Sequence, residues 1–233
     1  IEDITADYTN RNILHRLKAN DPNLDKLVVS NIRYRGECYC PESARDLGWL
    51  GYYIGQSMIL KELNFRSNPF QGCNVVEWFC RGVNINRSIQ KIRFVQMDLS
   101  GGEFVRLLRP FFENIHNMSD LMVKECLFGA GCAHQFSLAL GGCKKSLKSI
   151  KLSHIQMGEN DQLFEITEDA AFISMHSRLE KLELKAMSIR VLSAWKYHLC
   201  CALMPCCKSS ISITTTLMMT GSKLWWALSP ITG

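Results

Sequence analysis

The sequence lacks any long apolar stretch. No segment reaches the roughly 18 consecutive apolar residues that a membrane-spanning helix needs. No basic segment leads into an apolar one after Ile1, as it would in a secretory signal. These absences predict a protein without a membrane partner. Because the chain begins with Ile1 rather than Met, we also expect it to be a fragment of a longer protein whose targeting signal, if it has one, lies elsewhere.

The sequence also lacks a regular cysteine framework and a strong net charge. Its 11 cysteines are an odd number with irregular spacing, which is typical of small buried apolar side chains rather than of a disulfide framework. This usage favours a reducing compartment, and we expect the cytoplasm. A net charge of +5 in 233 residues is far below that of a dedicated nucleic-acid binder, so nucleic acid is a disfavoured partner.

Motifs of catalysis are missing as well. There is no P-loop, G-x-G-x-x-G, H-E-x-x-H or G-x-S-x-G. Cys132 and His134 are two residues apart, a spacing at which side chains entering a helix seldom face each other. Ser193 and Lys196 match S-x-x-K, but they fall in a C-terminal segment that has lost the pattern of the rest of the chain. We therefore expect neither enzymatic activity nor a cofactor.

Four C-terminal cysteines invite a zinc hypothesis that their spacing does not favour. They form two pairs of adjacent residues instead of the C-x2-C spacing that lets two sulfurs converge on one ion. These residues are Cys200, Cys201, Cys206 and Cys207. We expect no metal site.

What the sequence does contain is a repeat of the form L-x-x-L-x-L-x-x-N/C-x-L. Six copies begin at residues 24, 60, 89, 118, 147 and 179, so successive starts differ by 36, 29, 29, 29 and 32. The fourth and sixth positions alternate as in a short strand with both side chains on one face. These pairs are Leu27/Val29, Leu63/Phe65, Ile92/Phe94, Leu121/Val123, Ile150/Leu152 and Leu182/Leu184.

The ninth position of this pattern usually holds Asn or Cys, whose side chain can bond to the backbone of a turn. Only Asn68 and Cys126 keep that choice. The other four copies have apolar residues there, which we expect to pack in the core. They are Ile32, Met97, Ile155 and Met187.

Between the strand-like blocks, apolar residues recur at helical spacing. One set comprises Val76, Phe79, Cys80 and Val83, and another comprises Phe104, Val105, Leu108, Phe112 and Ile115. Each repeat is thus predicted to be one strand and one helix. The two longer steps need insertions. In the first, Cys38 and Cys40 indicate a longer loop, and the run from Leu47 to Ile54 indicates a helix; the second insertion falls within residues 158–178.

The pattern resembles the leucine-rich repeats of ribonuclease-inhibitor-like proteins over about residues 8–190. The resemblance implies an α/β solenoid, with parallel strands on the concave side of a horseshoe and helices on the convex side. We assign residues 1–22 to an N-terminal helix, a cap or the end of a preceding repeat, because Ile13, Leu14 and Leu17 form an apolar stripe. Residues 23–190 hold the six repeats, and residues 191–233 form a degenerate tail.

The tail is interpretable as a seventh repeat in a shifted reading frame. When the last base of each codon is joined to the first two of the next, Cys206-Cys207 must encode Leu and Trp225-Trp226 must encode Val. With permitted choices elsewhere, residues 222–233 can read K-A-L-V-G-A-L-A-N-N-G, an ordinary repeat helix. We therefore expect a frameshift between about Ile189 and Cys206, which leaves no selected function in the tail as written.

The third, fifth and seventh positions of each copy should point away from the core and line the concave face. They carry eight basic residues against Glu62, Asp120 and Glu183, so the face is mixed but basic. These charges either solvate an open sheet or steer an acidic partner. The candidate binding residues are Asn64, Arg66, Lys91, Arg93, Met122, Lys124, Lys151 and Lys185.

The resemblance implies a non-catalytic, monomeric scaffold that binds a protein, and a basic face favours a partner with an acidic surface. Two alternatives remain open. Some ribonuclease-inhibitor-like solenoids activate GTPases, although no motif here marks residues for a bound nucleotide. The basic face could also bind an acidic ligand including nucleic acid, although its strands lack the interleaved aromatics that stack on bases. Ribonuclease inhibition itself is not implied, because that ligand is basic.

Overall fold

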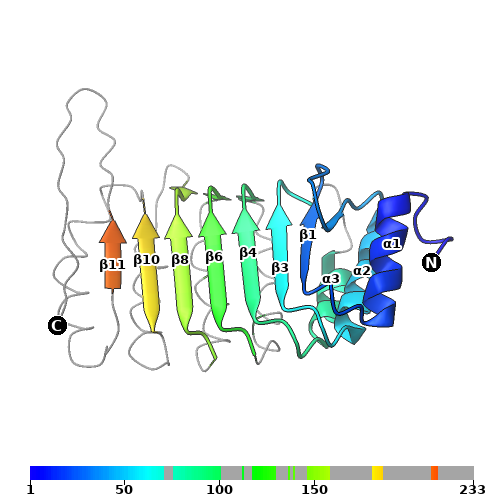
Figure 1. Ribbon diagram of the computed structural model, residues 1–233. Coiled ribbons are helices and arrows are strands. Elements are labelled where there is room, and N and C mark those ends of the chain that lie inside the picture. The colour runs from blue at the N-terminus through cyan, green and yellow to red at the C-terminus, as the bar shows by residue number, and fades with distance from the viewer. Residues whose placement is uncertain are drawn as a thin grey trace.

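The computed structural model describes residues 1–70, 76–100, 112, 117–129, 136, 139, 146–157, 180–185 and 211–214. Its main feature is a parallel sheet of eight strands in the order β11-β10-β8-β6-β4-β3-β1-β2; the strands from β11 to β1 form the row of arrows in Figure 1. The strands are β1 (Lys26–Ser30), β2 (Cys38–Tyr39), β3 (Glu62–Arg66), β4 (Lys91–Val95), β6 (Asp120–Lys124), β8 (Ser149–Ser153), β10 (Lys181–Lys185) and β11 (Ile211–Thr214). The predicted α/β class with a parallel sheet is confirmed.

The register of the main sheet follows the sequence repeat. Leu63 pairs with Leu27 on one side and Ile92 on the other, and the same fourth position continues through Leu121 and Ile150. The fourth- and sixth-position side chains of β1, β3, β4, β6 and β8 are all at most 2% exposed. Leu182 and Leu184 lie in β10, as predicted, with side chains outside the described part. Alternation with period two therefore fixes which face is buried.

Strands β3, β4, β6 and β8 are each followed by a similar turn. The eighth-position residues Gln96, Glu125 and His154 have φ of 55°, 54° and 52°, in the left-handed region. Their N–H groups donate to the last carbonyl of the neighbouring strand, at 2.9, 2.9 and 3.0 Å, and Ser67 does the same at 3.2 Å. Beyond this turn lies a second parallel sheet, formed by β5 (Asp98–Leu99), β7 (Leu127–Phe128) and β9 (Gln156–Met157).

The ninth position behaves largely as predicted. Asn68 Oδ1 accepts from the Asp98 N–H of the next copy, and Cys126 Sγ donates to the Phe94 carbonyl at 3.6 Å. Met97 and Ile155 are buried in the core, while Met187 lies outside the described residues.

The prediction for Ile32 is wrong, because its side chain is 55% exposed. The chain leaves β1 through an exposed loop and returns as the edge strand β2, which pairs with β1. Cys38 and Tyr39 are fully buried and supply apolar contacts at this edge instead. The segment read as a longer loop thus contains a strand.

Three helices are described, and all were predicted. α1 (Tyr8–Ala19) begins at Asp7, whose side chain accepts from the Asn10 N–H. α2 (Ala44–Gln56) begins with a capping box formed by Ser43 and Asp46. α3 (Val76–Val83) buries Val76, Phe79, Cys80 and Val83. Figure 1 shows α3, α2 and α1 at the β1 end of the row of strands. None of the helices described is long and apolar enough to cross a membrane.

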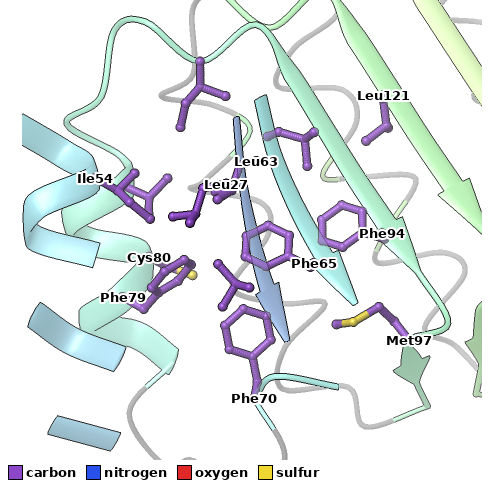
Figure 2. Close-up of a cluster of buried hydrophobic side chains, with 14 of the residues drawn as sticks. Leu27, Ile54, Leu63, Phe65, Phe70, Phe79, Cys80, Phe94, Met97 and Leu121 are labelled. Carbon is purple, nitrogen blue, oxygen red and sulfur yellow. The ribbon is translucent and has the colours of Figure 1, made fainter. Parts of the chain in front are cut away.

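Aromatic side chains join the sheet to the helices. The ring centroid of Phe65 lies 5.8 Å from that of Phe79 in α3 and 5.4 Å from that of Phe94 in β4. Figure 2 shows Phe65, Phe70 and Phe79 gathered in this layer. Of the helix predicted from Phe104 to Ile115, only Phe112 is described; it is helical and fully buried.

Glycines set the distance between α2 and α3. A Cβ on Gly51 would lie 2.5 Å from the Phe79 carbonyl oxygen, and one on Gly82 would meet the Gly51 backbone. Gly48, one turn earlier in α2, differs because its Cβ would lie 3.6 Å from Trp78 Cβ, an ordinary contact. Close backbone approach thus depends on Gly51 and Gly82.

Replacing Gly51 by Ala should destabilise the protein by about 1–3 kcal/mol, because the helices must separate. Gly48→Ala is the matched control in the same helix, and it should stabilise the fold by up to about 1 kcal/mol through better helix propensity. Urea denaturation measures both. Equal effects of the two substitutions would contradict this packing.

Replacing Leu121 by Ala should cost about 2–5 kcal/mol, because its side chain is 1% exposed in the middle of the sheet. Met122 is its neighbour on the opposite face and is only half-buried. Met122→Ala should therefore cost about 1 kcal/mol or less. The same denaturation experiment measures both costs. If Leu121→Ala costs as little as Met122→Ala, the assignment of Leu121 to the buried face and of Met122 to the open face is contradicted.

Candidate binding surface

The sheet face is the surface of the main sheet opposite α2 and α3. It consists of the third, fifth and seventh residues of each repeat, because the fourth and sixth point into the core. Register aligns these residues in three rows. Row three is Lys26, Glu62, Lys91, Asp120, Ser149 and Lys181; row five is Val28, Asn64, Arg93, Met122, Lys151 and Glu183; row seven is Ser30, Arg66, Val95, Lys124, Ser153 and Lys185.

The structure brings all eight candidate residues onto this one face, at unequal exposure. Lys91 is exposed, and Arg66 and Met122 are half-buried. Asn64 is only 8% exposed, so it presents little surface to a partner. The remaining side chains are 34–49% exposed. They are Arg93, Lys124, Lys151 and Lys185.

One acidic residue near the β1 edge neutralises part of the face. Glu62 Oε1 lies 3.1 Å from Lys26 Nζ and 3.0 Å from Arg93 Nε, and the Glu62 side chain is 13% exposed. Arg93 also donates from its guanidinium to Met122 Sδ at 3.8 Å. Arg93 is therefore held by two neighbours and is less free to meet a ligand than the sequence alone indicated.

A second acidic residue gathers three lysines near the β10 side. Glu183 lies 2.6 Å from Lys185, 3.0 Å from Lys151 and 3.6 Å from Lys181. Hydrogen bonds from Lys185 and Lys151 hold the pKa of the Glu183 carboxyl at about 2. One carboxylate among three ammonium groups leaves an excess of positive charge.

Arg66 is held in another way. Its guanidinium carbon lies 4.5 Å from the centroid of the Tyr34 ring, a cation–π contact. The Tyr34 hydroxyl is in turn 2.9 Å from Ser67 Oγ. Arg66 has no acidic partner among the residues described, and its Nε is buried without a hydrogen bond. The repeat pattern does not reveal this pair, because Tyr34 lies in the irregular loop between β1 and β2.

Two further groups on the face have unmet bonding capacity within the described part of the chain. Lys91 makes no ion pair there, although it lies between Glu62 and Asp120 in row three. The Asn64 Oδ1 atom is buried and accepts no hydrogen bond. On β4, Lys91 lies two residues before Arg93. On β3, Asn64 lies two residues before Arg66.

The described cysteines have the environment of packing residues. Burial raises the pKa of the Cys80 thiol to about 12 and that of Cys126 to about 11, so both stay protonated at neutral pH. No group of three potential metal ligands occurs in the part of the chain that the structure covers. The Cys132–His134 pair, the Ser193–Lys196 match and the four tail cysteines all lie outside the described residues.

The Glu183 ion pairs predict a pH-dependent stability. Because the folded-state pKa of about 2 lies below the ordinary value of 4.5, this contribution is present above about pH 4.5 and is lost as pH falls toward 2. The partly exposed lysines screen it to about 1 kcal/mol. Glu183→Gln should therefore destabilise the fold at pH 7, and its difference from wild type should vanish near pH 2.

Glu180→Gln is the control for this measurement, because Glu180 is 65% exposed and lies 3.4 Å from Lys148. It should change stability little at any pH. A Glu183→Gln difference that stays constant between pH 7 and pH 2.5 would contradict the assignment.

Comparison with known proteins adds little to this geometry. No protein-family model matches the chain, and no curated protein matches its sequence. Among solved structures, the tropomodulin C-terminal domain of Caenorhabditis elegans is similar, with a TM-score of 0.46 and 10% sequence identity over 84% of this chain and 91% of that one.

Proposed function

We propose that this chain is part of a leucine-rich-repeat solenoid of the ribonuclease-inhibitor-like kind that binds a protein with an acidic surface on the sheet face. Three features support the repeat assignment. The starts are spaced by 29 residues in three successive copies, the strands pair in the matching register, and the turns share a left-handed residue at the eighth position.

The observation that carries the binding proposal is the charge left over on the sheet face. Its three rows hold eight basic residues against three acidic ones, so 8 − 3 leaves +5 on one side of the sheet. Lys26 and Arg93 share Glu62, and three lysines share Glu183. A surface whose own acids cannot neutralise it attracts an acidic partner and speeds their encounter.

A protein fits this surface better than a nucleic acid does. The three rows contain no Phe, Tyr or Trp, and single-stranded nucleic acids are bound by stacking bases on such side chains. A row of parallel strands also offers the long open surface with which repeat proteins bind other proteins.

The test neutralises two basic residues of row three. Lys91→Gln removes a charge without an ion pair, and Lys181→Gln removes the longest of the three contacts to Glu183. Arg93 and Lys151 are less suitable because changing them breaks closer pairs. With a partner identified by affinity capture, the double variant should associate about tenfold more slowly at low salt, with a shallower dependence on ionic strength.

The control neutralises Lys18 in α1 and Arg81 in α3, which are exposed on the helices and change the net charge equally. This variant should associate like the wild type. If both double variants associate at the wild-type rate, or both slow equally, the sheet face is not the binding surface.

A further inference from the structure

Row seven differs from the other rows in containing no acidic residue. From β1 to β10 it reads Ser30, Arg66, Val95, Lys124, Ser153 and Lys185. Positive charges therefore alternate with small or apolar residues. Because neighbouring strands lie about 4.8 Å apart, the three charges recur about every 9.6 Å along a line across the strands.

The residues between these charges are uncharged and lie low between longer cationic side chains. Ser30 is buried, Val95 is 8% exposed and Ser153 is half-buried. None of the three has a long side chain. A ligand that lies along the row would therefore meet the longer Arg and Lys side chains rather than the residues between them.

The three cations of row seven can exchange their present contacts for a ligand. Arg66 has no acidic partner in the described part, so a ligand carboxylate would not have to displace one. Lys124 pairs with Glu125 at 3.0 Å, but both side chains are more than a third exposed, and such pairs contribute little. If Lys185 turns to a ligand, Glu183 keeps Lys151 and Lys181.

The spacing selects one peptide conformation. In a polyproline-II segment, residues three apart lie on the same side at about 9.3 Å, from a rise of 3.1 Å per residue. In a β-strand the same side recurs at about 6.6 Å. In an α-helix, residues seven apart lie on the same side and are separated by about 10.5 Å along the axis. Over two intervals the polyproline-II repeat departs from the row by about 0.6 Å, the helix by about 1.8 Å and the strand by about 6 Å, so polyproline II matches best.

We infer that row seven binds a polyproline-II segment of the partner that carries Asp or Glu at every third position, one carboxylate each for Arg66, Lys124 and Lys185. The inference rests on the proposed function, because it specifies which part of the sheet face recognises the acidic protein. Arg66, stacked on Tyr34, is oriented before binding and so favours carboxylate geometry.

Synthetic peptides test this directly. Three proline-rich peptides of equal length and charge carry three Glu residues at every second, third or fourth position, and a fourth peptide is helical with Glu at every seventh. Fluorescence anisotropy with the full chain measures each affinity. The every-third peptide should bind about tenfold more tightly than each of the others, because only it satisfies all three cations.

Two substitutions locate the site. Lys124→Gln should weaken the every-third peptide about tenfold, whereas Lys18→Gln in α1, which removes the same charge outside the sheet face, should leave its affinity within about twofold. Circular dichroism confirms folding of both variants, and the spacing series on the wild-type chain needs no variant at all.

Equal affinity for all spacings, tighter binding of the helical peptide, or an effect of Lys18→Gln as large as that of Lys124→Gln would each overturn the inference while leaving the acidic-partner proposal intact. Absence of binding by every peptide would also overturn it. The proposed function falls as well only if the Lys91→Gln/Lys181→Gln variant associates with the partner no more slowly than the control variant at Lys18 and Arg81 does.

Discussion

The parallel hydrogen-bond ladder, which holds equivalent residues of successive repeats side by side, is the constraint on which the rest of the structure depends. A shift of one residue would turn Leu121 and its counterparts outward and Met122 inward. The ladder does not end with the strands, because the eighth-position amides continue it into the turns. These turns place Gln96, Glu125 and His154 in a left-handed conformation that non-glycine residues adopt at a cost of about 1 kcal/mol. Repetition of the same conformation shows that the ladder outweighs that cost.

Register also governs the charges on the sheet face. Like charges directly opposite each other on neighbouring strands destabilise a sheet. Row three avoids them by alternating sign through Lys26, Glu62, Lys91 and Asp120, so its pattern has a structural explanation. Row seven avoids them in a different way, by placing Val95 and Ser153 between its cations. Separation relieves repulsion without neutralising the charge. The positive charge of row seven is therefore available to an acidic partner, whereas that of row three is partly neutralised. This difference is the reason for placing the proposed site at row seven.

Sequence periodicity predicted the strands well because their pattern is local. All six predicted copies contain a strand from the third to the seventh position, and the three described helices coincide with predicted apolar stripes. In the first copy, Ile32 is exposed and not buried as predicted. The buried residues Cys38 and Tyr39 of β2, which pairs with β1, supply the apolar contacts at this edge. Sequence also did not predict β11, whose Ile211 lies 211 − 182 = 29 residues after its partner Leu182. The frameshift in the tail stays a prediction.

The same periodicity predicted which residues form the rows of the sheet face. It could not predict which side chains of these rows contact one another. Which lysine approaches Glu183, or that Tyr34 lies against Arg66, depends on side-chain reach between repeats and on a loop of irregular shape. Pairing decides which cations are available to a partner, so the list of candidates could not be ranked from sequence. The structure makes Arg93 and Asn64 weaker candidates for binding, because Arg93 is paired and Asn64 is buried. It makes Arg66 and Lys91 stronger candidates, because neither has an acidic partner among the described residues.

Native-state hydrogen exchange at the eighth position tests the central claim about the register most directly. Gln96, Glu125 and His154 are exposed residues in turns, where amide protons ordinarily exchange fast. Because each donates to the carbonyl that ends the neighbouring strand, their amides should exchange as slowly as those of Ile92 and Leu121 inside the sheet. Fast exchange at all three positions, with slow exchange in the strands, would show that the ladder stops at the strand ends and would contradict the account.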